Sequence, residues 1–368
     1  MRFSVARGEL VNALAIAGRA VSSRSTLPIL SGFLISSSSS GGVVLQATDL
    51  EVSVRHTIPM AGIERPGSAV LPGKLLTDII RSLPEAAVTI AVEGEVAIVS
   101  CLQSSFTLRV LPADDFPRFP EVDEKESFSL PATSVKDAVH HVIKATSRDE
   151  TRPILTGILL AIDGPILKTV ATDSYRLAVK ESVLEQPNTQ NVEVVVPART
   201  LDEVVRSMDE KDSVSISVTD NQIVIRFRET TFVTRRIEGT FPNYRQLIPK
   251  DEETTVVVSR EEMISAVKRV SLLAQHNAPL RLSVRAEDQT LSLSAKTHDV
   301  GDASEDLMAE VRGADVEIAF NHSFLIDGLL SAEGDTVSIS IVSPLKPGVI
   351  TSPQDSGFLY LLMPVRLS

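Results

Sequence analysis

Apolar positions along the chain follow two spacings, one typical of helices and one typical of strands. Residues 7–21 and 71–83 carry apolar side chains three or four positions apart, and in the second segment this stripe includes Leu75. Residues 88–100 and 214–227 instead alternate apolar with polar positions, and each run has turn residues at its middle, Glu93-Gly94 and Asp220-Asn221. Helices combined with hairpins predict an α+β fold with antiparallel sheets.

This pattern recurs with a period of about 125 residues, which is the main organising feature of the sequence. PILSGFLI at 28–35 returns as PILTGILL at 153–160, and Ala-Thr-Asp at 47–49 returns at 171–173. LPGKLLTDIIRSL at 71–83 likewise matches VPARTLDEVVRSM at 196–208, and a fainter third copy is FNHSFLIDGLLSA at 320–332.

Three copies account for the whole chain. The period is too long for one unit of a solenoid, so each copy is predicted to be a domain. The Pro- and acid-rich segments 112–127 and 241–253 are the candidate boundaries. We therefore expect three domains of one topology, and their ranges are 1–120, 121–248 and 249–368.

Composition excludes several classes of protein. The formal net charge is −12, and a single cysteine, Cys101, rules out an intrachain disulfide and a thiolate zinc site. No signal peptide and no apolar run of membrane-spanning length are recognisable, so we expect a cytoplasmic protein without membrane contact. The acidic balance by itself argues against a nucleic-acid partner.

The charge is nevertheless unevenly distributed between element types. The segments predicted to be helical carry +5 in total, which leaves −17 for the strands and loops. These segments are 7–24, 73–83, 134–148, 198–208, 260–274 and 321–332. A mildly basic helical surface backed by acidic sheets would attract phosphate groups locally.

Catalytic signatures are missing from the sequence. Phosphate-binding loops, dinucleotide fingerprints, zinc-protease motifs and nucleophile elbows are not found. His140 and His141 are adjacent on a predicted helix, which is a poor chelating geometry, and we expect them on an exposed or DNA-facing helical surface. We expect no enzyme, no cofactor and no metal site.

The repeat, the charge distribution and four local strings together resemble the bacterial DNA polymerase III beta subunit, the replicative sliding clamp. The strings are TRPILTG (151–157), VATDSYRLA (170–178), FPNYRQLIP (241–249) and LMPVRL (362–367). The resemblance implies three clamp domains per chain and a head-to-tail dimeric ring with helices lining the bore. Twelve helices about 9 Å apart make a circle roughly 34 Å across, which leaves a bore of roughly 24 Å.

The same resemblance implies where the chain touches its partners. Candidate contacts to duplex DNA are Arg24, Arg152, Lys74, Lys144, Arg148 and Arg199. The implied partner-peptide pocket comprises Leu155, Thr172, Tyr175, Arg176, Leu177, Pro242, Asn321, Phe324, Leu362, Met363, Pro364, Val365 and Arg366. Arg176 and Arg366 are expected to form a polar rim for this pocket. The implied dimer interface comprises Phe106 and Leu108 on an edge strand together with Leu272 and Leu273.

The resemblance thus predicts a non-enzymatic homodimer that encircles DNA without sequence preference. Implied partners are the DNA polymerase III alpha subunit, clamp-loader subunits, other polymerases, ligase and mismatch-repair proteins, which bind through QLxLF-like peptides. Two alternatives remain open at this point: a ring-less DNA-binding or adaptor module of the same fold, and a hydrolase with an unrecognised site. Solution mass would separate the first from a clamp, and a tightly bound metal or cofactor would favour the second.

Overall fold

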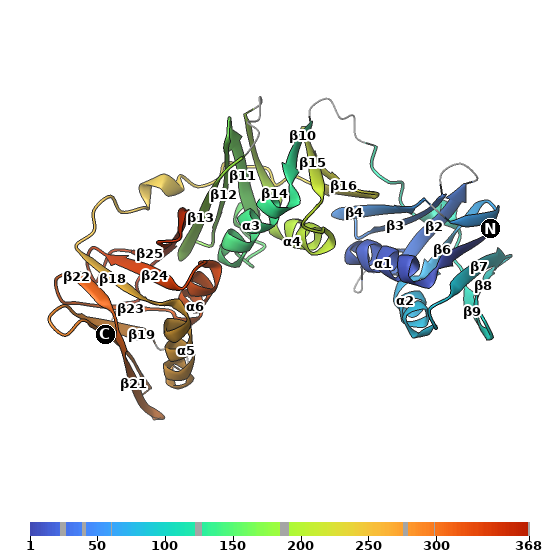
Figure 1. Ribbon diagram of the computed structural model, residues 1–368. Coiled ribbons are helices and arrows are strands. Elements are labelled where there is room, and N and C mark those ends of the chain that lie inside the picture. The colour runs from blue at the N-terminus through green and yellow to red at the C-terminus, as the bar shows by residue number, and fades with distance from the viewer. Residues whose placement is uncertain are drawn as a thin grey trace. The chain divides into compact units, whose positions relative to one another are not determined.

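The computed structural model describes residues 1–22, 27–38, 42–59, 61–121, 127–184, 191–274, 279–297 and 299–366 (Figure 1). Arg24 lies outside these ranges. The described chain forms two compact units, the first from residues 1–133 and 203–236 and the second from 134–202 and 237–368. Among the helices of these ranges, none combines the length and apolar character that a membrane crossing requires.

Six α-helices occur in the described chain, two in each sequence repeat. They are α1 (Arg7–Ala17), α2 (Gly73–Ser82), α3 (Ala132–Val142), α4 (Ala198–Ser207), α5 (Arg260–Val270) and α6 (His322–Ser331). The first helix of each repeat ends earlier than its apolar spacing predicts, because the next three residues tighten into a 3₁₀ turn. These turns are Gly18–Ala20, Ile143–Ala145 and Ser271–Leu273.

The helices bury their apolar stripes as the spacing predicts, with one exception. In α2, Leu76, Ile79 and Ile80 are buried, whereas Leu75 is half exposed. The expectation that Leu75 belongs to the buried stripe is therefore wrong, because the stripe of positions three and four apart begins at Leu76. The two helices α1 and α2 pack against each other in the first unit, as α5 and α6 do in the second (Figure 1).

The first unit contains two antiparallel sheets. One has the order β5-β1-β7-β8-β9, and its strands are Gly62–Arg65, Arg2–Ala6, Ala87–Glu93, Val96–Cys101 and Ser104–Arg109. The other has the order β10-β15-β16-β17-β4-β3-β2-β6. Its strands are Ser127–Pro131, Ser213–Val218, Gln222–Phe227, Thr230–Arg235, Val52–Ile58, Gly42–Thr48, Gly32–Ser38 and Gly67–Pro72. The expected hairpin between β7 and β8 turns at Gly94, whose φ of 60° suits glycine.

The second unit also contains two antiparallel sheets. The larger has the order β14-β11-β12-β13-β26-β25-β24-β18-β22. Its strands are Val192–Pro197, Gly157–Asp163, Ile166–Thr172, Arg176–Val183, Asp355–Leu362, Gly348–Ser352, Thr336–Ile341, Thr254–Ser259 and Glu310–Gly313. The smaller has the order β21-β20-β19-β23, with strands Gly301–Met308, Thr290–Thr297, Leu280–Arg285 and Val316–Phe320.

Sheets extend from one sequence repeat into the next. In the first unit β17 pairs with β4, and in the second unit β13 pairs with β26. This continuity explains why the compact units differ from the domain ranges expected from the repeats. The α+β fold with antiparallel sheets is confirmed, since every strand pairing in the described chain is antiparallel.

Candidate functional site

By candidate groove we mean the surface over the β13–β26 pair that the resemblance assigns to a partner peptide; these two strands run side by side in the second unit. Leu177 pairs directly with Leu361, and both side chains are buried in one apolar cluster. Tyr244 belongs to the same cluster. Phe241 and Ile248, which lie before and after Tyr244 in the sequence, pack against the cluster. The buried members of the cluster are therefore not accessible to a partner in this structure. Leu155 is buried in the same unit.

Exposed apolar side chains lie where β13 begins and β26 ends. Tyr175 is 62% exposed, Met363 41% and Val365 36%. Beyond β26 the chain continues in an extended course, because the Met363 N–H donates to the Tyr175 carbonyl at 2.9 Å and the Val365 N–H donates to the Ala319 carbonyl at 2.8 Å. Pro242 and Arg366 are exposed as well, and Pro364 is partly covered.

The turn from β12 to β13 is built by side chain to backbone hydrogen bonds. Thr172 Oγ1 donates to the Arg176 carbonyl at 2.7 Å, and Asp173 Oδ1 accepts from the N–H groups of Tyr175 and Arg176. Ser174 adopts a left-handed φ of 82° inside this turn. Thr172 is buried here, so the structure gives it a turn-forming role under the groove.

The same turn occurs in the first repeat, which explains the repeated Ala-Thr-Asp string. Thr48 Oγ1 donates to the Val52 carbonyl at 3.0 Å, and Asp49 Oδ1 accepts from the Val52 N–H at 2.8 Å. Leu50 has a φ of 77°, matching Ser174. The Ala-Thr-Asp string therefore recurs because it forms the same turn in both repeats. By itself it is not evidence of a binding site.

Arg176 is buried among acidic partners, which differs from the rim position expected from the sequence. Its Nε lies 2.9 Å from Asp173 Oδ2, and its Nη1 lies 2.5 Å from Asp327 Oδ2. The guanidinium carbon also lies 4.3 Å from the ring centroid of Phe324. Because both carboxylates belong to the chain itself, the positive charge of Arg176 is already compensated.

Phe324 and Tyr175 form an aromatic pair at the end of the groove. Their ring centroids are 6.4 Å apart with the planes inclined by 27°, which is a stacked arrangement. Asn321 caps α6, and its Oδ1 accepts from the N–H groups of Ser323 and Phe324. Asn321 thus fixes the start of α6, whose third residue is Phe324.

Strand register places Leu362 opposite Arg176, whereas Leu361 pairs with Leu177. Side chains alternate between the two faces of a sheet, so Leu362 lies in the layer of Arg176 and not in that of Leu177. Leu361, which the sequence analysis did not name, packs with Leu177 in the buried cluster, because β13 lies beside β26.

Three of the candidate DNA contacts come together around a cavity of the second unit. This cavity of about 550 Å³ is lined by Lys144, Arg148 and Arg152, and Tyr175 and Phe324 also face it. Arg152 is exposed, and its Nε lies 2.8 Å from Asp149 Oδ2. Burial lowers the pKa of Lys144, and a neighbouring carboxylate on α6 only partly offsets this effect. Arg148 is exposed at the rim.

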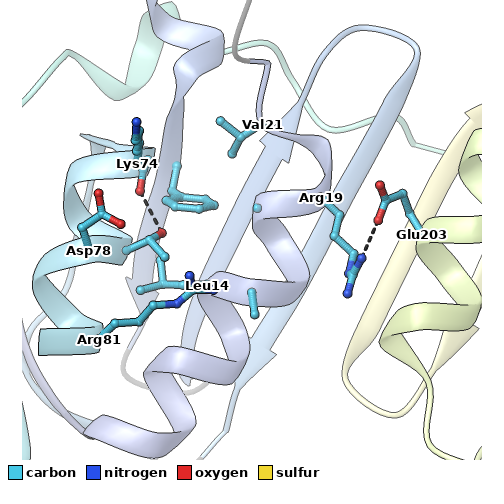
Figure 2. A pocket seen from close by; sticks show the side chains of 12 residues that line it. Leu14, Arg19, Val21, Lys74, Asp78, Arg81 and Glu203 are labelled. Carbon is cyan, nitrogen blue, oxygen red and sulfur yellow. Dashed lines mark hydrogen bonds and ion pairs between the residues drawn. The ribbon is translucent and has the colours of Figure 1, made fainter.

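The first unit has a comparable hollow between α1 and α2. Figure 2 shows Lys74, Asp78 and Arg81 of α2 along one side of this cavity of about 560 Å³, and the opposite side ends at Arg19. Arg19 Nη1 lies 2.5 Å from Glu203 Oε2, which joins helical segments of the first and second repeats. Lys74 is exposed at this surface. Arg199 is exposed too, but it belongs to the second unit, at the start of α4.

The expected interface residues differ in exposure. β9 is an edge strand of its sheet, as expected, and Phe106 on it is 36% exposed. Leu108, two positions later, is buried in the core of its own unit, so it is not available to a partner as the structure stands. Leu272 is 72% exposed on the 3₁₀ turn after α5, and Leu273 is half buried.

One group of potential metal ligands contains Asp137, His141 and Glu333. His141 is fully buried, so the expectation that it lies on an exposed helical surface is wrong. Its Nδ1 lies 2.7 Å from the Asp137 carbonyl, and Lys180 Nζ lies 3.2 Å from Asp137 Oδ2. Lys180 also lies 2.6 Å from Asp355. The lysine already supplies positive charge to these carboxylates, so we interpret the group as an ion-pair cluster.

Comparisons with known proteins give one consistent result. Three family models match in succession: the DNA polymerase III beta subunit N-terminal domain at residues 1–120, its central domain at 129–243 and its C-terminal domain at 245–366. The beta sliding clamps of Streptomyces coelicolor and Bacillus subtilis are 35% and 31% identical, and each match covers both chains completely.

Solved structures agree with the sequence matches. The DNA polymerase sliding clamp of Bacillus subtilis superposes with a TM-score of 0.94 at 30% identity, and the DNA polymerase III beta subunit of Thermotoga maritima with 0.93 at 27%. Both matches cover the whole of each chain. The resemblance seen in the sequence is thereby confirmed, and the chain belongs to the DNA polymerase III beta subunit family of sliding clamps.

Proposed function

We propose that this protein is a DNA sliding clamp that confers processivity on DNA polymerase III and performs no chemistry of its own. The observation that carries the proposal is the succession of the family's three domains at residues 1–120, 129–243 and 245–366. We retain the ranges 1–120, 121–248 and 249–368 as the proposed clamp domains. Two chains would close head to tail into a ring around duplex DNA.

Closure would use exposed apolar side chains of the first and third repeats. Phe106 on the edge strand β9 is half covered, and an uncovered apolar edge favours pairing with another chain. Leu272 offers the most exposed apolar side chain of the expected set, and Leu273 lies next to it. Leu108 would support Phe106 from inside its own sheet.

Contact with DNA would be weak and independent of sequence. The proposed contacts are Arg24, Arg152, Lys74, Lys144, Arg148 and Arg199, which belong to or flank the helical segments. A protein that must slide cannot bind any phosphate tightly, so modest positive charge suits a topological link to DNA. The helical segments carry +5 and the strands and loops −17, so the negative charge lies mainly outside the helical segments.

The candidate groove would bind short peptides with a QLxLF-like sequence. Its support comes from the buried leucine cluster, the aromatic pair and the exposed apolar side chains of the terminal segment. An extended peptide with two large apolar anchors suits such a groove. Through it the clamp would tether the polymerase III alpha subunit, clamp-loader subunits, other polymerases, ligase and mismatch-repair proteins.

Retention on DNA of different topology tests the proposal. Clamps loaded by a clamp loader onto nicked circular DNA should stay bound during gel filtration at moderate salt. Cutting the circle once should release them, because a ring slides off a free end. Equal retention on circular and linear DNA would show direct binding and would refute the topological link.

A further inference from the structure

Arg176 joins two elements that are far apart in the sequence. Asp173 belongs to the turn before β13, whereas Asp327 belongs to α6 and is 151 positions from Arg176. Hydrogen bonds between a guanidinium and a carboxylate are stronger than neutral ones, and arginine keeps its charge at any ordinary pH. The guanidinium therefore holds α6 against the turn that carries Tyr175.

Tyr360 supports the same cluster from β26. Its side chain is fully buried, its hydroxyl accepts from Arg176 Nη1 at 3.3 Å, and the hydroxyl donates to the Phe324 carbonyl at 3.1 Å. Burial raises the pKa of Tyr360, so the hydroxyl keeps the proton that it donates. α6 can approach this ring because position 328 is glycine: a Cβ there would lie 2.6 Å from ring carbons of Tyr360.

We propose that Asp327 and Tyr360 are positioning residues of the partner-peptide groove. They hold Arg176 and the start of α6, and through these they hold the Phe324 ring where it stacks with Tyr175. Tyr360 is fully buried, so it can influence a bound peptide only through the residues that it holds. The inference rests on the proposed function, since it names the residues that organise that groove before a peptide arrives.

Loss of this support should weaken peptide binding without unfolding the protein. In Asp327→Asn the guanidinium keeps Asp173 and the Tyr360 hydroxyl but loses one charged partner. Phe324 and Tyr175 would then occupy additional rotamers that a peptide must order again. Ordering two side chains corresponds to a rise in Kd of about 5- to 150-fold.

The three tyrosines, Tyr175, Tyr244 and Tyr360, allow the aromatic pair to be observed directly. Full-length protein labelled with 3-fluorotyrosine should give three ¹⁹F resonances, assigned by single Tyr→Phe variants. In Asp327→Asn the Tyr175 resonance should shift or broaden while the Tyr244 resonance stays in place. The affinity for a fluorescent QLxLF peptide should fall in parallel, and Asp327→Glu, which keeps the charge, should restore part of it.

Asp315→Asn is the matched control, because it removes one exposed carboxylate from an ion pair with Arg285 elsewhere in the same unit. An unchanged Tyr175 resonance and unchanged affinity in both Asp327→Asn and Tyr360→Phe would overturn the inference. The inference would also be overturned if Asp327→Asn lowered the melting temperature while its Tyr175 resonance and peptide Kd matched those of the control. Asp327 would then stabilise the fold without positioning the groove. If the Tyr175 resonance moves but the wild-type protein does not bind the peptide, the groove's proposed function fails while the positioning stands.

Discussion

Deleting residues 363–368 should separate peptide binding from folding. β26 ends at Leu362, and its pairing with β13 and β25 is complete without the deleted residues. Among described residues, the deletion removes the backbone hydrogen bonds donated by Met363 and Val365. At about 1 kcal/mol each, their loss lowers the free energy of unfolding by roughly 2 kcal/mol. The truncated protein should therefore stay folded.

The effect on binding follows from the remaining exposed area of the deleted side chains. Complete burial of a methionine or valine side chain contributes about 2 kcal/mol, and Met363 and Val365 retain 41% and 36% of their exposure. Covering that remainder contributes about 1.5 kcal/mol for the two together, which is roughly tenfold in Kd. Loss of the partly covered Pro364 side chain would raise the Kd further.

Fluorescence polarisation with a labelled QLxLF peptide measures the Kd, and sedimentation and thermal unfolding report the dimer and the fold. A protein that lacks only residues 367 and 368 is the matched control, because every described residue remains. We expect the control to bind as the full chain does, and the longer deletion to bind at least tenfold more weakly. Full-strength binding by the longer deletion would place the groove elsewhere and refute the residue assignment.

Three further predictions test closure, DNA contact and the buried histidine. Leu272→Ala with Leu273→Ala should give a folded monomer that is lost from closed circles; an unchanged dimer in sedimentation would contradict the interface. Arg24→Ala with Arg152→Ala should weaken loading or residence equally on different DNA sequences, and a sequence-specific footprint of the protein alone would contradict sliding. Burial lowers the pKa of His141, but hydrogen bonds to the neighbouring aspartate outweigh it and raise the pKa above 6.5. Its stabilising contribution is complete below about pH 6.5 and disappears as pH rises through the raised pKa, so His141→Gln should lose less thermal stability than wild type between pH 6 and 9.

Short-range sequence patterns were sufficient to predict the secondary-structure elements and the family. The helices start within two residues of their expected positions in all three repeats, because helical spacing of apolar residues is a property of short segments. Their ends were less predictable, as the 3₁₀ turns after α1, α3 and α5 show. Family membership was readable because strings such as VATDSYRLA combine turn chemistry with buried strand positions in one short stretch.

The sequence did not show which residues distant along the chain lie in contact. Nothing local indicates that Arg176 lies between Asp173 and Asp327, or that Leu361 and not Leu362 faces Leu177. The sequence did not show side-chain exposure either. Phe106 and Leu108 share a strand, yet only Phe106 is exposed to solvent.

The sequence by itself determined the repeat, the element types and the family, and it supplied the residues proposed for the groove. Tertiary structure decided which of those residues form a surface and which hold it in place. The physical reason is that side-chain direction within a strand or helix is set by local periodicity, whereas burial and charge pairing depend on the neighbouring element. For Arg176 that neighbour is α6, which is distant in sequence but adjacent in the fold.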